Sequence, residues 1–251
     1  MMIKKWFSRL TSPKLFYETT TSWVIPIGII TFILLCSGSI WALVFSPEDF
    51  QQGNSYRIMY IHVPASFVAL ASYYAMAISG AIYLIWRIKL ADVFLRSLAG
   101  VGAVMTVIAL FTGSIWGKPT WGVWWVWDAR ISSMLILLFL YLGIIALYES
   151  FDGNTALAAK LTSLLALVGT VNIPIIYKSV DWWYTLHQPA SIKLTGESTI
   201  HSSMWWPLVL MILGFYFFVG LATLLSMRAE VLVREKNSRW VKVILGVPHV
   251  K

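Results

Sequence analysis

The side chains best suited to chemistry in this sequence are histidines that lie beside aromatic stretches. His62 stands in the run HVP at the end of an apolar stretch, and His187 stands in the run TLHQP. A lone histidine in a loop is usually just solvated, but two on one side of a protein, each beside aromatic sequence, favour a ligand role. A neutral imidazole is a common axial ligand of haem iron. The pattern therefore favours a site for a metal-bearing, flat macrocycle.

Tryptophan is concentrated in one segment, WGKPTWGVWWVWDAR, which spans residues 116–130. It contains Trp116, Trp121, Trp124, Trp125 and Trp127. An aromatic belt at the membrane interface is the alternative explanation, but a belt decorates both interfaces and spreads over many helix ends. A one-sided cluster indicates a platform for a large, flat and partly apolar ligand, because tryptophan offers wide, rigid contact area. If the segment 121–128 were helical, Trp121, Trp124, Trp125 and Asp128 would share one face.

Charged residues near this cluster add two kinds of candidate contact. Arg57 and Arg130 suit the carboxylates of haem propionates, and each is equally well explained as an anchor at the membrane interface. Asp128 has three open roles: capping a helix, pairing with Arg130, or orienting a histidine. The sequence has a single cysteine, Cys36, and therefore no C-x-x-C-H motif. It therefore carries neither an internal disulfide nor covalently attached haem.

The elements that position these residues are membrane helices. The chain has 251 residues, of which 59% are hydrophobic and 12% are charged, and its mean hydropathy is +0.75. These values exclude a typical soluble enzyme. We expect an all-α integral membrane protein, a single membrane domain over residues 1–251, with six transmembrane helices. The expected spans lie near Trp23–Phe45, Ile61–Trp86, Phe94–Ile115, Ile131–Tyr148, Leu157–Tyr177 and Trp205–Met227.

The distribution of lysine and arginine predicts the orientation. Fourteen of the nineteen basic residues fall at the two chain ends or in the loops after the second and fourth spans. The positive-inside rule therefore places both termini in the cytoplasm and the tryptophan-rich loop outside. The same rule, with anionic lipid headgroups, explains the net charge of +8, so nucleic acid is not an expected partner. The five basic residues expected outside are Arg57, Lys118, Arg130, Lys178 and Lys193.

Three ordered motifs carry a resemblance to a known family. They are QQGNSYRIMYIHVP (51–64), GSIWGKPTWGVWWVWDARISS (113–133) and NIPIIYKSVDWWYTLHQ (172–188). The second resembles the tryptophan-rich WWD domain of haem-handling proteins in cytochrome c biogenesis. Six spans and this chain length are similar to the haem exporter protein C (CcmC) family of that group, and the resemblance covers most of the chain.

The resemblance implies a haem site on the periplasmic side of the bacterial inner membrane. His62 and His187 would be the axial ligands of a transiently and non-covalently bound haem b. The WWD segment, residues 116–130 between the third and fourth spans, would contact the porphyrin and a partner. That partner is the haem chaperone CcmE, whose histidine bonds to a haem vinyl group. The resemblance also implies the small subunit CcmD and the ABC transporter subunits CcmA and CcmB.

Two residues stand apart from the resemblance. Many family members are expected to carry an acidic residue where Met134 stands, and His201 belongs to no recognised motif, so we expect it to be a solvated loop residue.

Other classes of function fit less well. An electron-transfer cytochrome usually needs histidines facing each other within the membrane, and the spans have none at mid-depth. A haem-conducting exporter needs a polar stripe that the spans lack. The longer haem lyases of the superfamily, which act on apocytochrome, have more spans and more histidines. We therefore expect a haem-presenting scaffold and transfer protein, and the sequence leaves open whether it promotes the covalent bond between haem and chaperone.

Overall fold

The computed structural model describes residues 11–151, 153–188 and 200–246. Within these residues the chain is helical and has no β-strand. Six helical stretches there are long and apolar enough to cross a membrane, which confirms the expected all-α class and the number of spans. They cover Val24–Phe45, Asn54–Trp86, Lys89–Trp121, Ala129–Ser150, Thr155–Trp182 and Ser202–Arg234.

Three of the six spans are single helices, and the other three each join two helical elements. The helices are α2 (Pro13–Thr21), α3 (Val24–Ile40), α4 (Met59–Trp86), α5 (Lys89–Trp121), α6 (Ala129–Ser150), α7 (Thr155–Gly169), α8 (Asn172–Trp182), α9 (Ser202–Arg234) and α10 (Arg239–Ile244). A π-helical turn, Trp41–Phe45, continues α3, and a 3₁₀ turn, Asn54–Ile58, precedes α4. The second to sixth spans are all longer than the sequence predicts, because their helices continue past the apolar core into interfacial sequence.

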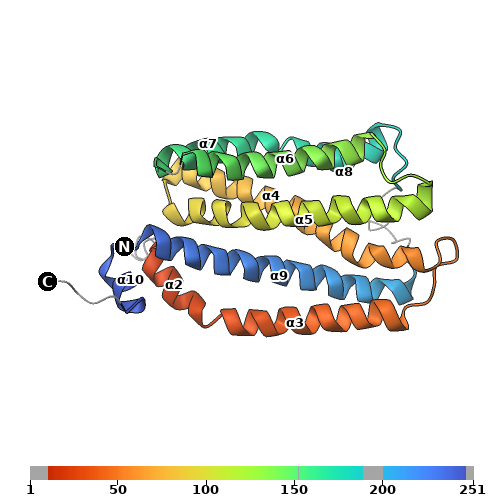
Figure 1. Cartoon of the computed structure of the whole chain (residues 1–251), viewed down its shortest axis with the longest axis horizontal. Helices are drawn as coiled ribbons and strands as arrows, with labels where there is room; N and C mark the ends of the chain where they lie inside the picture. Colours follow the sequence, from red (N-terminus) through yellow and green to blue (C-terminus); the bar gives the residue numbers. More distant parts are fainter. Residues whose placement is uncertain (1–10, 152, 189–199, 247–251) are drawn as a thin grey trace.

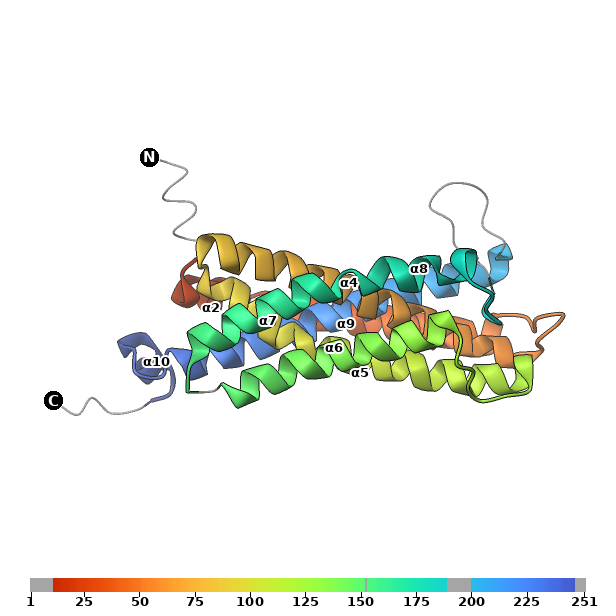
Figure 2. The ribbon, with the colours of Figure 1, turned by 90° about the horizontal axis from the view of Figure 1, so that it is seen from above.

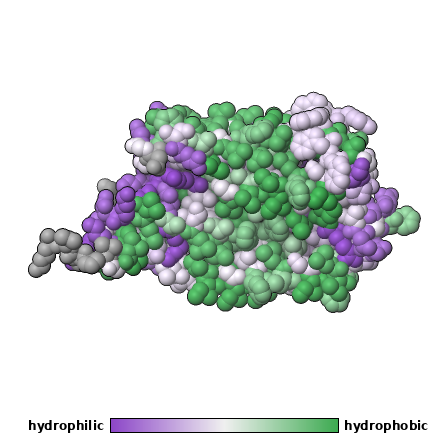
Figure 3. Space-filling model, viewed as in Figure 1, coloured by the Kyte–Doolittle hydropathy of each residue, from purple (hydrophilic) through white to green (hydrophobic). Residues whose placement is uncertain are grey.

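The long helices lie side by side in one bundle (Figure 1). The pair α4 and α5 forms its centre, with α6, α7 and α8 on one side and α9 on the other. Helix α3 packs on the far side of α9. Figure 2 shows from above that α5, α6 and α9 follow the same long axis. The hydrophobic side chains cover the middle of the surface seen in Figure 3, and hydrophilic ones gather at both ends, as expected for a membrane-spanning bundle.

Buried tyrosines packed on glycines bring the central helices together. Tyr141 is fully buried, and its hydroxyl donates to the Ala69 carbonyl at 2.7 Å. A Cβ on Gly102 would overlap the Tyr141 ring, and a Cβ on Gly169 would overlap the Tyr73 hydroxyl. Small residues of this kind allow close packing between membrane helices, where apolar burial alone gives little driving force.

The two ends of the bundle differ in character. The "basic end" carries α2 and α10, with Lys14, Arg239 and Lys242. The "histidine end", opposite to it, carries His62, His187 and the segment that joins α5 to α6. The helices nearest the two termini thus lie at the same end, and which side of the membrane that end faces stays a prediction. Five of the basic residues counted above lie outside the described residues: Lys4, Lys5, Arg9, Lys193 and Lys251.

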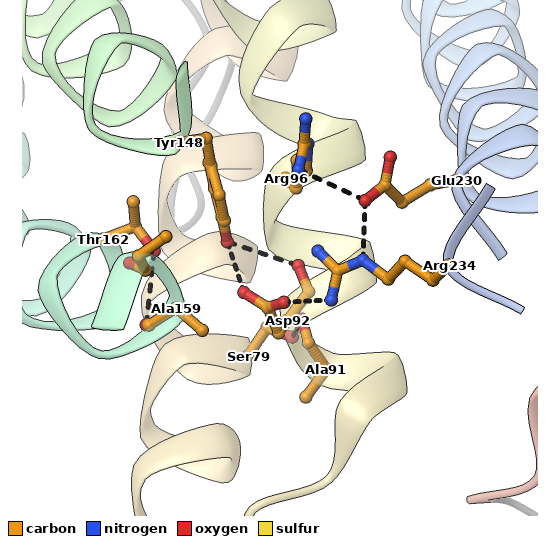
Figure 4. A network of polar contacts seen from close by, with 10 residues as sticks. Ser79, Ala91, Asp92, Arg96, Tyr148, Ala159, Thr162, Glu230 and Arg234 are labelled. Carbon is orange, nitrogen blue, oxygen red and sulfur yellow. Dashed lines mark hydrogen bonds and ion pairs between the residues drawn. The ribbon is translucent and has the colours of Figure 1, made fainter. Parts of the chain in front are cut away.

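A buried network of charges joins three helices toward the basic end (Figure 4). Asp92, which is only 2% exposed, accepts hydrogen bonds from the Arg234 guanidinium and from the Tyr148 hydroxyl. Glu230 accepts from Arg234 at 2.6 Å and pairs with Arg96 at 3.3 Å. Because an unpaired buried charge is costly, each member of this network depends on its partners, and the network fixes α5 against α6 and α9.

We predict that Asp92→Asn lowers the free energy of unfolding of the purified protein by about 1–3 kcal/mol. The substitution removes a negative charge that is paired with the largely buried guanidinium of Arg234. The measurement is the midpoint of thermal unfolding in detergent. The matched control is Glu18→Gln, which removes a carboxylate from an exposed pair with Lys14 at 3.6 Å and is expected to have almost no effect. Equal midpoints for Asp92→Asn and the control would show that the network does not stabilise the bundle.

Candidate functional site

His62 and His187 lie next to each other at the histidine end. Their ring centres are 6.4 Å apart and their planes meet at 32°. His62 belongs to the first turn of α4, whereas His187 lies in the chain that follows α8. The fold therefore brings together two imidazoles that are far apart in the sequence.

The His62 ring is held in one orientation by α5. Its Nδ1 lies 2.9 Å from the carbonyl oxygen of Ala109, and a carbonyl can only accept, so Nδ1 carries the proton. The other nitrogen, Nε2, is then the basic one. Gly113 makes room for the ring, because a Cβ at this position would lie 2.9 Å from His62 Cε1. A backbone acceptor on one nitrogen that leaves the other free is the usual arrangement of a metal-binding histidine.

His187 has an equivalent arrangement in the chain that follows α8. Its Nδ1 donates to the Gln188 carbonyl at 3.0 Å, and its backbone N–H donates to Thr185 Oγ1 at 3.1 Å. Burial, helped by the positive charge of Arg130, lowers the pKa of the His187 imidazole from its usual 6.5 to about 4. The ring is therefore neutral near pH 7, which is the form that binds a metal.

Two tryptophans from the end of α5 frame the histidine pair. The Trp116 ring meets His62 edge-on with 5.8 Å between centres, and the Trp121 ring lies 6.0 Å from His187. Trp116 is fixed in turn, because its indole N–H donates to Gln52 Oε1 at 2.7 Å. Both tryptophans are helical residues, since α5 continues to Trp121.

The chain between Trp121 and α6 is not helical, so the conditional expectation of a shared helical face over 121–128 is wrong. Gly122 has a φ of +80° and caps the end of α5, a conformation that glycine adopts readily. Trp124 and Trp127 then point outward, with 58% and 76% of their surface exposed. Trp125 is partly buried, and its ring centre lies 5.4 Å from that of Trp127. The segment therefore contributes exposed aromatic surface beside the histidines.

Asp128 and Arg130 differ in how far their charges are satisfied. Asp128 Oδ1 accepts from the Ile131 N–H at 2.8 Å, so the aspartate caps α6, the first of its three open roles. Its Oδ2 is buried without a hydrogen-bond partner among the described residues. Arg130 forms no hydrogen bond or ion pair with any residue that the structure describes, yet its charge reaches His187. The carboxylates of Asp128 and Asp181 also attract Arg130, and its N–H groups remain available to an anionic ligand.

Arg57 is engaged elsewhere. Its guanidinium donates to the carbonyl oxygens of Ala42 at 2.7 Å and Ser46 at 2.8 Å, and to Asn54 Oδ1 at 2.8 Å. It thus satisfies carbonyls at the end of the π-helical turn that continues α3. The guanidinium also donates to the Leu43 carbonyl, so four of its five N–H groups already have an acceptor. The expected contact between Arg57 and a propionate stays a prediction.

The two remaining residues of interest have structural roles. Met134 is buried in the main hydrophobic core. His201 is exposed, as expected, and it also caps α9 through its ring Nδ1, which accepts from the Ser203 N–H.

Gln52 and Gly113 are site residues that the sequence analysis did not single out. Both lie inside the ordered motifs. Residue type alone, however, does not show that a glutamine positions a tryptophan or that a glycine makes room for an imidazole. Only the packing of α5 against the start of α4 reveals them.

We predict that Gly113→Ala weakens haem binding at the histidine pair by about fivefold to a hundredfold, because the new methyl group displaces the His62 ring. The measurement is a titration with haem followed by its Soret absorption. Gly100→Ala is the control on the same helix, since a Cβ there meets no atom within 4 Å. If both variants bind like the unchanged protein, the position of the His62 ring is not important for binding.

Comparison with known proteins gives a consistent family. The family profile described as Heme exporter protein C matches residues 6–242. A protein named Heme exporter protein C from Escherichia coli strain K12 is 45% identical over 242 residues, covering 96% of this chain and 97% of the relative. Proteins of the same name from Haemophilus influenzae and Bradyrhizobium diazoefficiens are 42% and 41% identical, over 96% and 91% of this chain and 97% and 86% of those relatives.

The match covers nearly the whole length of the chain and includes His62, His187 and the tryptophan-rich segment. The chain therefore belongs to the Heme exporter protein C family.

Proposed function

We propose that this protein binds haem between His62 and His187 and presents it to the haem chaperone CcmE during cytochrome c maturation. The observation that carries the proposal is the 6.4 Å separation of the two imidazole centres. An imidazole nitrogen binds a metal at about 2 Å, so two axial imidazoles on one iron have their ring centres about 6 Å apart. The name of the relatives, Heme exporter protein C, points to the same cargo.

The protonation of the two rings suits this cargo. Each Nδ1 lies within hydrogen-bonding distance of a backbone carbonyl, so each Nε2 is available as a ligand. The only cysteine, Cys36, lies in α3, which packs on α9 and not against the histidine pair. No thioether link to this chain is then available, and the proposed cargo is haem b, held without a covalent bond so that it can leave.

The surroundings of the histidines divide into residues for the ring and residues for the partner. Trp116 and Trp121 pack against the imidazoles and would contact the macrocycle. Arg130 acts on His187 through its positive charge and forms no hydrogen bond with any described residue, so its guanidinium suits a propionate. Trp124 and Trp127 are mostly exposed, and they suit a protein surface that approaches the haem edge.

The charge distribution supports the proposed placement in the cell. Fourteen of nineteen basic residues are at the basic end of the bundle or in the sequence that leads there, so that end faces the cytoplasm of a bacterial inner membrane. The histidine end then faces the periplasm, in contact with lipid headgroups and with CcmE. The small subunit CcmD and the transporter subunits CcmA and CcmB would complete the membrane complex.

We predict that His62→Ala and His187→Ala each lose most of the low-spin Soret absorption of the purified protein, because each removes an axial ligand. His201→Ala is the matched control, since this exposed histidine caps α9 and lies outside the pair. The measurement is the absorption spectrum, with haem content per protein determined separately. Wild-type spectra for both variants would rule out the proposed ligands.

We predict that two tryptophan variants separate haem retention from haem transfer. Trp116→Ala should lower the amount of haem retained, because Trp116 packs on His62. Trp127→Ala should retain haem but slow its covalent transfer to CcmE, because 76% of this side chain is exposed. The measurements are haem content and the rate of haem appearance on CcmE. Identical behaviour of the two variants in both assays would contradict this division.

A further inference from the structure

A small polar cavity opens at the histidine end, and the expected haem ligands do not line it. Its volume is about 230 Å³, and it is lined by Gln51, Gln52, Ser55, Pro119, Thr120 and Gln188. None of these side chains carries a charge. The cavity is built from three separate parts of the chain: the turn before α4, the last turn of α5 and the stretch after α8.

The cavity borders the histidine pair through its own lining residues. The Gln188 carbonyl accepts the hydrogen bond from His187 Nδ1. Gln52 accepts from the indole of Trp116, the ring that packs on His62. A ligand held between the histidines therefore has its edge next to this space.

The lining offers hydrogen-bond donors that nothing in the described structure uses. Gln52 Oε1 is occupied by Trp116, so its amide N–H groups remain for the cavity. The side-chain amides of Gln51 and Gln188 have no hydrogen-bond partner among the described residues. Ser55 and Thr120 donate to the backbone carbonyls of Gln52 and Trp116. The unused groups include the amide N–H donors of all three glutamines, which suit an acceptor with several lone pairs, such as a carboxylate.

The size of the cavity limits what enters it. Pockets that bury a whole drug-sized ligand measure about 300–1,000 Å³, so this space is too small for a macrocycle. One water needs only about 10–15 Å³ of such space, so there is room for a carboxylate with its methylene groups.

We propose that this cavity is a subsite for one carboxylate-bearing side chain of the bound haem, a proposal that rests on the proposed function above. Arg130 is not among the lining residues, so the cavity is a second and uncharged carboxylate site. Neutral amides hold a carboxylate by hydrogen bonds without a paired cation. Such a hold is weaker than a bidentate arginine contact and suits a cargo that is passed on.

The test changes the charge of the cavity and of the ligand separately. Gln51 is exposed and lines the cavity, so Gln51→Glu and Gln51→Lys introduce opposite charges without loss of a core contact. Each variant is titrated with haem and with haem dimethyl ester, whose carboxylates are masked. Ser202→Glu, an exposed position outside the cavity at the same end of the bundle, controls for added charge.

We expect Gln51→Glu to weaken haem binding by up to about fivefold, the size of a charge interaction at a partly exposed site, and Gln51→Lys to strengthen it or leave it unchanged. Neither variant should change the affinity for the dimethyl ester, and Ser202→Glu should change neither affinity. Equal haem affinity for Gln51→Glu and Gln51→Lys would overturn the subsite while leaving haem binding intact, and so would an equal loss for the ester. An unchanged protein that binds neither ligand would instead overturn the proposed function, and the subsite with it.

Discussion

The hydrogen bond between His62 and the Ala109 carbonyl is the contact on which the histidine end depends. It fixes the proton on Nδ1 and leaves Nε2 available. The same stretch of α5 supplies Gly113, which admits the ring, and Trp116 and Trp121, which frame both histidines. If α5 ended where its apolar core ends, near Ile115, neither Trp116 nor Trp121 would be held by a helix. The length of α5 past the apolar region therefore builds the site.

The bundle keeps α5 in register with its neighbours by two different means. In the apolar middle, glycines on one helix receive tyrosines from another, as at Gly102 and Tyr141. Toward the basic end, Asp92 at the start of α5 is paired with Arg234 of α9 and hydrogen-bonded to Tyr148 of α6. These contacts hold the start and the middle of one long helix, so its far end can present ring contacts with fixed geometry.

Patterns that repeat along the chain predicted the architecture well. Hydropathy predicts the six apolar stretches and their approximate limits, and the tryptophan cluster is evident in the amino-acid sequence. The sequence did not predict that Trp116 and Trp121 are helical while residues 123–128 are not, because Gly122 and its left-handed conformation decide that boundary. Nor did the sequence show which of its three possible roles Asp128 has. Its role as a helix cap depends on where α6 begins.

The finer features of the site depend on contacts between segments distant in sequence. Gln52 matters only because Trp116 reaches it, and Arg57 is drawn to the carbonyls of Ala42 and Ser46 by the fold of the preceding turn. No pattern within one segment contains this information. The pairing of His62 with His187 was implied by resemblance to a family, and the structure places the two rings together.

The most direct test of the central claim is electron paramagnetic resonance of the ferric haem complex of the purified protein. Two neutral imidazoles on opposite faces of one iron predict a low-spin spectrum of the bis-histidine type, which becomes high-spin in His187→Gly and returns to low-spin when imidazole is added. A high-spin signal from the unchanged protein, or a low-spin signal that survives in His187→Gly without imidazole, would contradict the account.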